Sequence, residues 1–194
     1  MLLQNKYYEV LEKFVGDYTK EIYGRELIGK VSISQKAIAL TLEELEHKSI
    51  LKSAKKGNIR LFTLNHVNSE IKDIISQVEL NRKMQFLSNN RKLAYVFRND
   101  DRIIGIFGSY ASGTQKKNSD IDVFIIGSKN EMDYDTVGKT FDVDISIKYF
   151  SLSDFKGLLK EKNNLCKEII KNHIIIFGIE QFIGIIWRNY YGFD

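Results

Sequence analysis

The spacing of apolar residues predicts mostly helices in the first half of the chain. Apolar side chains recur every three or four positions, which is the pattern of a helix that buries one face. We predict helices over these ranges: Tyr7 to Val15, Lys20 to Val31, Gln35 to Ser49, Ser69 to Leu87 and Lys92 to Phe97. Ser34 precedes the third of them and suits the N-cap position. Two short strands, Leu51 to Lys55 and Asn58 to Leu64, would form a hairpin around Lys56-Gly57.

Apolar runs with strand character dominate the second half. Ile103 to Phe107 and Ile121 to Ile126 are short runs bounded by charge or glycine, which indicates buried strands. Thr140 to Tyr149 alternates between apolar and polar residues and predicts a third strand with carboxylates on its polar face. A helix with Ser153 as N-cap would follow and run to about Lys162. The chain would end on three more elements: a helix over Leu165 to Lys171, a strand over His173 to Phe177 and a helix over Ile179 to Tyr190.

This order of elements predicts an α+β chain with two domains. We assign residues 1–66 to the first domain, 67–98 to linking helices and 99–194 to the second domain. The hydrophobic and charged fractions, 43% and 28% of 194 residues, are typical of a soluble globular protein. The net charge of +4 is compatible with binding of nucleotides or nucleic acid without requiring it.

Composition also bounds the location and the chemistry. No apolar run approaches the roughly 20 residues of a membrane span, and no signal peptide is evident, so we expect no membrane partner. A single cysteine, Cys166, excludes an intrachain disulfide and favours a cytoplasmic protein. The three histidines are far apart in the sequence and have no metal-ligand spacing. We therefore expect them to be surface residues or hydrogen-bonded core residues.

The clearest chemistry lies between Gly105 and Gly127. Asp120 and Asp122 stand at the start of an apolar strand, where residues two apart point to the same face. Two neighbouring carboxylates are unfavourable unless positive charge lies between them, and a divalent cation with oxygen ligands would supply it. The preceding strand ends at Gly108-Ser109, where a helix start would offer backbone N–H groups and a hydroxyl to a phosphate.

Gly108-Ser109 followed after ten residues by Asp120-Ile-Asp122 resembles the signature of the polymerase-β-like nucleotidyltransferases. The local sequence FGSYASGTQKKNSDIDVFII is most similar to the minimal nucleotidyltransferases of that superfamily. The resemblance implies an α/β nucleotidyltransferase fold with a mixed sheet. It also implies nucleotide binding through Gly108, Ser109 and Ser119, with Ser119 chiefly orienting the loop, while Lys116 and Lys117 would offset phosphate charge or form a solvated loop tip.

The resemblance further implies Mg²⁺ or Mn²⁺ as cofactor and a nucleoside triphosphate, ATP first, as substrate. Members of the superfamily use three carboxylates, so Asp120 and Asp122 would be metal ligands and catalytic residues together with a third. Asp144 best matches the apolar-Asp-apolar element of the next strand. Asp142, on the same predicted face, stays open as the alternative. Some relatives of this two-domain kind lack the third carboxylate and have lost catalysis.

The first domain resembles a winged helix-turn-helix domain over about Leu2 to His66. In such a domain the third helix enters the major groove and the hairpin tip contacts phosphates. The resemblance implies DNA-binding roles for these residues: Gln35, Lys36, Lys55, Lys56 and Arg60. Three acidic residues in the second half of the same helix argue against tight DNA binding. The alternative is a module for dimerisation or for docking a partner protein.

Two functions follow from these resemblances. The first is an enzyme that transfers a nucleoside monophosphate, AMP first, to a hydroxyl group of a protein or small molecule, because little chain remains for a domain that grips a primer or tRNA. The second is a DNA-binding regulator, antitoxin-like, whose nucleotidyltransferase domain only senses nucleotide or docks a partner. The sequence is compatible with a homodimer in either case.

Overall fold

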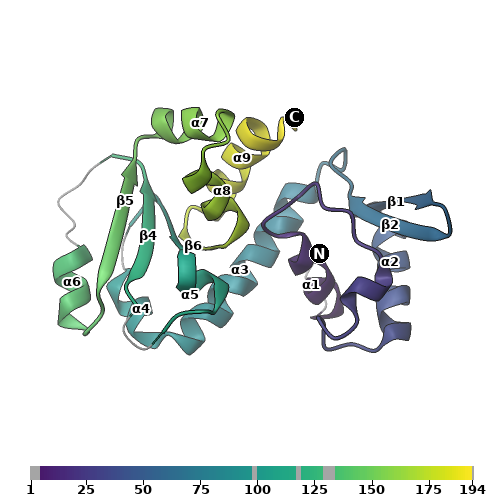
Figure 1. Ribbon diagram of the computed structural model, residues 1–194, viewed down its shortest axis with the longest axis horizontal. Helices are drawn as coiled ribbons and strands as arrows, with labels where there is room; N and C mark the ends of the chain where they lie inside the picture. Colours follow the sequence, from purple (N-terminus) through teal and green to yellow (C-terminus); the bar gives the residue numbers. More distant parts are fainter. Residues whose placement is uncertain (1–4, 98–99, 117–118, 129–133, 194) are drawn as a thin grey trace. The chain divides into compact units, whose positions relative to one another are not determined.

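The computed structural model describes residues 5–97, 100–116, 119–128 and 134–193 (Figure 1). The chain divides into two compact units, and the boundary falls between Val78 and Glu79, inside helix α3 (Ile71–Asn89). Phe193 is grouped with the first unit. No helix in the described part of the chain is long and apolar enough to cross a membrane.

The first unit combines short helices with a two-stranded hairpin. Its elements are α1 (Asn5–Leu11), 3₁₀ turns at Glu12–Phe14 and Gly24–Leu27, α2 (Gln35–His47), β1 (Leu51–Lys56) and β2 (Ile59–Leu64). Ser34 caps α2 as predicted, because its hydroxyl accepts a 3.3 Å hydrogen bond from the Ala37 N–H. Leu11, Phe14 and Leu45 are fully buried and form part of the core of this unit.

The predicted helix over Lys20 to Val31 is wrong. Only the 3₁₀ turn at Gly24–Leu27 forms there. Ile22 instead exchanges two backbone hydrogen bonds with Phe62 of β2, at 2.7 and 2.9 Å, which extends the hairpin by one bridge. Gly29 follows with a φ of +76°, outside the helical region. Tertiary pairing of Ile22 therefore outweighs the apolar spacing of this segment.

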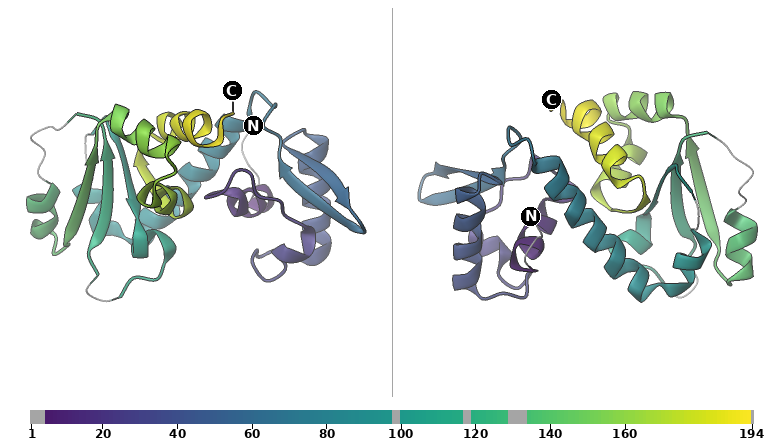
Figure 2. Two further views of the ribbon diagram at one scale, coloured as in Figure 1. Left: turned by 45° about the horizontal axis from the view of Figure 1, so that its top comes forward. Right: turned by 180° about the vertical axis from the view of Figure 1, so that it is seen from behind.

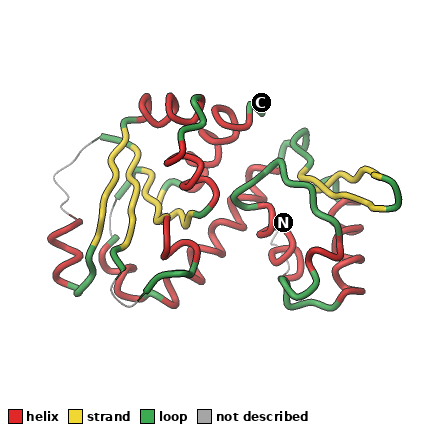
Figure 3. The backbone as a smooth tube through the Cα atoms, viewed as in Figure 1, coloured by secondary structure: helices red, strands yellow, loops and turns green. Residues whose placement is uncertain are grey.

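The second unit is built on a mixed sheet (Figure 3). Within the described residues the sheet has the strand order β5-β4-β3-β6. The strands are β3 (Ile103–Phe107), β4 (Ile121–Ile126), β5 (Ile145–Phe150) and β6 (His173–Phe177). β3 is antiparallel to both β4 and β6, whereas β4 and β5 are parallel. The predicted strands β3, β4 and β6 are confirmed residue for residue.

Helices cover both faces of this sheet. They are the second half of α3, α4 (Arg91–Val96), α5 (Gly108–Ser112), α6 (Tyr134–Thr140), α7 (Leu152–Lys160), α8 (Asn164–Lys171) and α9 (Ile179–Ile186), which continues as a π-helix over Trp187–Tyr191. Leu93 of α4 and Tyr134 of α6 share one core cluster with the odd-numbered positions of β4. On the other face Phe124 packs against Phe155 of α7 and Phe182 of α9, with ring centroids 6.5 and 5.6 Å away. Figure 2 shows the helices near the C-terminus, green to yellow, beside the sheet.

The third strand begins later than its alternating pattern predicts. Thr140 ends helix α6, and β5 starts only at Ile145. The N–H groups of Phe141, Asp142 and Val143 bond back to carbonyls of α6, so they cannot join the β4 ladder. A strand start at Thr140 is therefore wrong by five residues.

The N-cap of α7 also differs from the prediction. The Ser151 hydroxyl accepts a 3.1 Å hydrogen bond from the Asp154 N–H and caps the helix. Ser153 lies inside the first turn, and its hydroxyl is 2.8 Å from that of Ser151. Both positions carry the residue type that caps helices, so the local sequence alone does not decide between them.

Candidate active site

Gly108 and Asp122 meet where β3 ends and β4 begins. Phe107, the last residue of β3, lies opposite Asp122 in the antiparallel register. Gly108 follows with a φ of +67°, and a Cβ at this position would be 2.5 Å from Oδ2 of Asp122. Glycine therefore allows both the left-handed backbone and the close approach of that backbone to the carboxylate.

Asp122 lies in an electrostatically unfavourable place. Its pKa is raised, first by burial and then by the negative charge of Asp120, while Lys148 on β5 acts in the opposite direction. Neither Asp120 nor Asp122 forms an ion pair with a lysine or arginine among the described residues. The two carboxylates are thus close enough to interact, and no side-chain cation of the described chain pairs with them.

Asp144 reaches the same end of the sheet from the neighbouring strand. β4 and β5 pair in parallel, with Ile121 beside Ile145 and Asp122 beside Ser146. The Ile121 N–H donates a 2.9 Å hydrogen bond to the Asp144 carbonyl. Continuing this register by one residue places Asp144 beside Asp120, and paired residues of a parallel ladder project from the same face.

Asp142 has a different environment from the one predicted for it. It has a φ of +54° in the turn after α6, and its side chain is 93% exposed. Its carboxylate lies 3.6 Å from the Lys92 ammonium of α4. Because Asp142 is not on a strand, it does not share a sheet face with Asp120, and the geometry favours Asp144 as the third carboxylate.

The structure brings together the two aspartates of β4 that were predicted to bind a metal, but it does not form a three-residue metal site among the described residues. The described residues contain no group of three or more His, Cys, Asp or Glu side chains placed to hold a metal ion. The oxygen donors of Asp120 and Asp122 do suit a hard divalent cation, and the raised pKa of Asp122 marks a place where positive charge is missing. The paired aspartates therefore fit Mg²⁺ or Mn²⁺ by their chemistry.

Comparison with protein families gives a match to this part of the chain. Residues 91–181 match the family model described as "Polymerase beta, Nucleotidyltransferase". This match identifies a nucleotidyltransferase domain over those residues. The matched range contains Gly108, Ser109 and the three aspartates at 120, 122 and 144. Comparisons with curated proteins and with solved structures found no match.

In the nucleotidyltransferase domain the predicted phosphate-binding residues lie at the start of α5. Ser109 is half-buried, and its hydroxyl makes no hydrogen bond with another described residue, so it is free to bind a ligand. The Ser119 hydroxyl accepts a 2.9 Å hydrogen bond from the Lys116 N–H, and the Ser119 N–H donates to the Lys116 carbonyl at 3.1 Å. This exchange supports a loop-ordering role for Ser119. Lys117 lies outside the described residues.

The predicted DNA-binding residues lie on two exposed elements of the first unit. Gln35 and Lys36 begin α2 and are exposed. Lys55 and Lys56 are exposed at the end of β1, next to the hairpin turn, where Gly57 has a φ of +62°. These four side chains are available to solvent.

Arg60 is already engaged within the first unit. Its guanidinium forms an ion pair with Glu46 of α2 and donates a 2.9 Å hydrogen bond from Nε to the Ser53 hydroxyl. The Ser53 hydroxyl in turn donates to Glu46 at 2.5 Å. Arg60 therefore connects the hairpin to α2, and its charge is largely compensated there.

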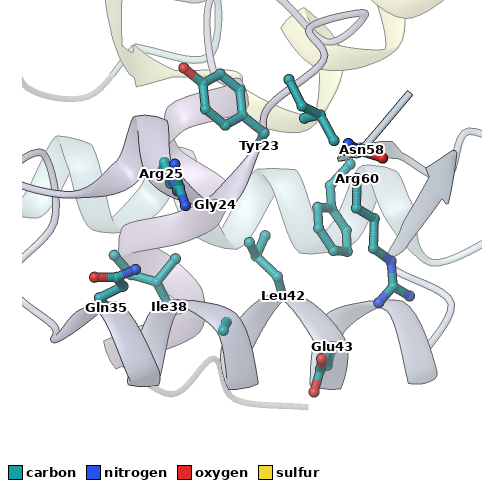
Figure 4. A pocket seen from close by; sticks show the side chains of 12 residues that line it. Tyr23, Gly24, Arg25, Gln35, Ile38, Leu42, Glu43, Asn58 and Arg60 are labelled. Carbon is teal, nitrogen blue, oxygen red and sulfur yellow. The ribbon is translucent and has the colours of Figure 1, made fainter. Parts of the chain in front are cut away.

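A pocket of about 540 Å³ lies between α2 and the hairpin in the same unit (Figure 4). Its lining includes the apolar side chains of Ile38, Leu42 and Phe62 and the polar side chains of Gln35 and Arg60. The sequence gives no signal for this pocket because its lining comes from segments that are far apart along the chain.

Sequence reasoning also missed a buried charge cluster in the second unit. Glu79 of α3 is fully buried, with Nε2 of His173 at 3.0 Å and Nη1 of Arg82 at 2.8 Å. Burial alone would raise the pKa of Glu79, but the charges and hydrogen bonds of His173 and Arg82 outweigh it and lower this pKa. His173 is thus a hydrogen-bonded core residue, and it lies opposite Phe107 in the β3–β6 register.

A second buried pair stands at the opposite end of β3. Asp100 accepts hydrogen bonds from Nε and Nη2 of Arg102, at 2.9 and 2.6 Å, and another from the Tyr134 hydroxyl. Burial opposes ionisation of this carboxyl, but the hydrogen bonds from Arg102 and Tyr134 hold its pKa at about 2. Arg102 also donates to the Ser128 carbonyl at 3.1 Å. This cluster joins the start of β3 to α6 and has a structural role.

Proposed function

We propose that this protein transfers a nucleoside monophosphate, with AMP as first candidate, from a nucleoside triphosphate to a hydroxyl acceptor. The observation that carries the proposal is the close approach of the Gly108 backbone to Asp122, whose pKa Asp120 helps to raise. This pair lies within the residues that match the nucleotidyltransferase family. Paired carboxylates beside a glycine turn suit a site that binds phosphates through a metal ion.

Each candidate residue has a separate role in the proposal. Asp120 and Asp122 would hold Mg²⁺ or Mn²⁺, which when bound neutralises phosphate charge and acidifies an acceptor hydroxyl. Ser109 offers its unpaired hydroxyl to the β- and γ-phosphates, and Gly108 keeps the backbone close to them. Asp144, exposed beside Asp120, is placed to accept the proton of the acceptor hydroxyl.

The proposed reaction is a substitution at the α-phosphorus of the nucleoside triphosphate. The acceptor oxygen forms a bond to the α-phosphorus, and the bond from that phosphorus to the oxygen bridging to the β-phosphorus breaks. Pyrophosphate leaves with this bridging oxygen and its electron pair, while the hydroxyl proton passes to Asp144. A protein side chain or a small molecule is the acceptor we favour.

We also propose that the first unit acts as a winged helix-turn-helix domain that binds DNA. The exposed lysines Lys55 and Lys56 beside the hairpin turn favour this role, as do Gln35 and Lys36 at the exposed start of α2. In this second candidate function the chain is a regulator, and its nucleotidyltransferase domain senses nucleotide or docks a partner protein. The engagement of Arg60 by Glu46 weakens the DNA contact predicted for that residue.

The transfer is tested by incubation with each α-labelled nucleoside triphosphate and Mg²⁺. Wild type should transfer label to an acceptor, and Asp120→Asn should reduce the transfer about a hundredfold or more because a metal ligand is lost. In parallel, ATP with Mg²⁺ should raise the melting temperature of wild type but not of Asp122→Asn. A thermal shift that persists in Asp122→Asn would remove the metal assignment.

Binding to DNA is tested by titrating duplex DNA at several salt concentrations. If the hairpin lysines contact phosphates, the double variant Lys55→Gln and Lys56→Gln should bind more weakly and with a salt slope flatter by roughly two. Arg60→Gln provides a comparison, since its partner is Glu46. No measurable binding by wild type at low salt would discard the regulator.

A further inference from the structure

A row of paired residues connects the buried charge cluster of the second unit with the candidate active site. Asp122 lies opposite Phe107 in the antiparallel β3–β4 register, and Phe107 lies opposite His173 in the antiparallel β3–β6 register. Paired residues of an antiparallel ladder project from the same face, so these three side chains share one face of the sheet. We call Glu79, Arg82 and His173 the buried triad. His173 is the member of the triad that belongs to this row.

The aromatic contacts of this face agree with the register. The ring centroid of Phe107 lies 6.1 Å from that of Phe124, which is two residues after Asp122 on β4. The His173 ring lies 5.1 Å from the ring of Phe182 of α9, which in turn lies 5.6 Å from the Phe124 ring. His173 is therefore on the face of the sheet that carries Asp122, and the buried side chain of Phe107 stands between them in the row.

The hydrogen bonds of His173 determine the charge that it shares with Glu79. Nδ1 lies 3.0 and 2.9 Å from the carbonyl oxygens of Ile169 and Ile170, which only accept, so Nδ1 carries a hydrogen. Nε2 lies 3.0 Å from Oε1 of Glu79, and this hydrogen bond needs a second hydrogen, either on Nε2 or on the carboxyl group. In both placements the pair of His173 and Glu79 is neutral.

The guanidinium of Arg82 therefore gives the buried triad a net charge of +1, since it adds one positive charge to a neutral pair. Its Nη1 lies 2.8 Å from Oε2 of Glu79. Glu79 and His173 are buried, and the side chain of Arg82 is only 13% exposed. The charge of the triad is thus held inside the second unit, where salt and water screen it little.

A positive charge in this place acts on ligands of the candidate active site. Two strand spacings separate His173 from Asp122, which is about 10 Å between the backbones. The side chain between them is the buried ring of Phe107, and charges interact more strongly through apolar surroundings than through water. Gly108, at the start of the proposed phosphate site, directly follows Phe107. The triad therefore attracts an anion at this site and repels a cation.

We propose that the buried triad acts as a positioning charge, which favours binding of phosphates at Gly108-Ser109 and opposes binding of a metal ion that arrives without a nucleotide. This inference rests on the proposed nucleotidyl transfer, because it takes the phosphates to bind at the glycine turn and the metal ion at Asp120 and Asp122. The aspartate pair then receives its metal ion chiefly as the complex with the nucleotide. His173 is a positioning residue, since it acts through its charge from the core.

The test uses two ligands of opposite charge. Mn²⁺ alone is a cation and is titrated by electron paramagnetic resonance, whereas ATP with equimolar Mg²⁺ is an anion and is titrated by calorimetry. His173→Gln removes one positive charge and keeps a donor for Glu79, and Arg82→Gln removes one from α3. Each variant should weaken binding of the ATP complex about three- to tenfold and strengthen binding of Mn²⁺ about as much or more. Damage to the fold would weaken both ligands.

Two controls separate charge from packing. Arg82→Lys keeps the charge, and Lys167→Gln removes one that is exposed on α8, where water and salt screen it. Both should stay within about twofold of wild type for both ligands. Should His173→Gln fail to fold, Arg82→Gln on the other element carries the same comparison.

Weaker binding of both ligands in the two charge-removing variants would overturn the inference and leave the triad a structural role only. Unchanged binding of both ligands would overturn it as well. In these two outcomes wild type still binds the ATP complex, so the proposed function stands. If wild type binds neither ligand, the proposed function itself fails, and the inference fails with it.

Discussion

At the scale of single residues, Gly108 joins backbone geometry to the chemistry of Asp122. Residues other than glycine adopt its φ of +67° only at a cost in free energy. In addition, Oδ2 of Asp122 occupies the space that a Cβ would need. Gly113, at the other end of α5, has a similar φ of +70° but nothing within 4 Å of a Cβ. Comparing substitutions at the two glycines therefore distinguishes the effect of backbone strain from the effect of displacing the Asp122 carboxylate.

Gly108→Ala and Gly113→Ala should each lower the free energy of unfolding by about 1 to 2 kcal/mol, because both place alanine in the left-handed region. Only Gly108→Ala should also displace Asp122 and reduce nucleotide binding with Mg²⁺, by about tenfold or more. Urea denaturation and calorimetry measure the two effects. Equal losses of binding in the two variants would mean that α5 as a whole, and not the contact with Asp122, is responsible.

Asp100 gives a prediction about pH. Its pKa is lowered from 3.8 to about 2 in the folded protein, so the stabilisation it provides is complete above pH 4 and is lost as the pH falls toward 2. The shift corresponds to about 2 kcal/mol. Asp100→Asn should therefore lower the free energy of unfolding by about 2 kcal/mol at pH 7, and this difference should shrink between pH 4 and pH 2.

Urea denaturation of the Asp100→Asn protein and wild type at pH 7, 4, 3 and 2 measures this difference. Lys92→Gln is a suitable control, because the pair with Asp142 is exposed and such pairs contribute little. A difference between Asp100→Asn and wild type that is the same at every pH would show that the stabilisation does not depend on ionisation of this carboxyl.

At the scale of elements, the parallel pair β4 and β5 decides which acidic residue follows the ladder position of Asp120, although the three carboxylates do not form one metal-binding group among the described residues. A parallel pair needs a crossover connection, here through α6. The N–H groups of residues 141–143 donate hydrogen bonds to carbonyls of α6, so the ladder between β4 and β5 begins only at Ile145. Continuing its register by one residue places Asp144 next to Asp120. The connection thus sets the register, and the register selects Asp144 over Asp142.

The start of α7 allows a direct comparison of two serines. Ser151 accepts the capping hydrogen bond from the Asp154 N–H, whereas Ser153 does not. Ser151→Ala should lower the free energy of unfolding by about 1 kcal/mol, and Ser153→Ala by less than half of that. Chemical denaturation of both variants checks this order. A larger effect of Ser153→Ala would restore Ser153 as the effective cap.

At the scale of the whole molecule, two units with separate cores share helix α3. The boundary at Val78 and Glu79 falls within that helix, and Glu79 anchors its second half to His173 of β6. Because each unit buries its own apolar residues, we expect a ligand to stabilise chiefly the unit that binds it.

Hydrogen exchange can test this independence. ATP with Mg²⁺ should slow amide exchange about tenfold or more in β3, β4 and α5, and leave the amides of α2 and the β1–β2 hairpin nearly unchanged. Asp122→Asn is the control, in which ATP should have no effect. Equal slowing across both units would show that they unfold as one cooperative body.

The sequence by itself determined the elements whose signals are local. The runs Ile103 to Phe107, Ile121 to Ile126 and His173 to Phe177 are apolar enough, and bounded clearly enough, to form strands whatever lies around them. The glycine-serine turn and the paired aspartates belong to the same category, because their spacing along one hairpin-like segment already brings them together. The family match to residues 91–181 agrees with that reading.

Only the tertiary structure decided the features that depend on distant partners. Ile22 joins the hairpin rather than a helix because Phe62 offers it hydrogen bonds, and Glu79 tolerates burial because His173 and Arg82 surround it. Asp144 comes to lie beside Asp120 because parallel strands pair across a crossover. Such pairings leave no trace in local periodicity, since the partners are brought together by the packing of the whole domain.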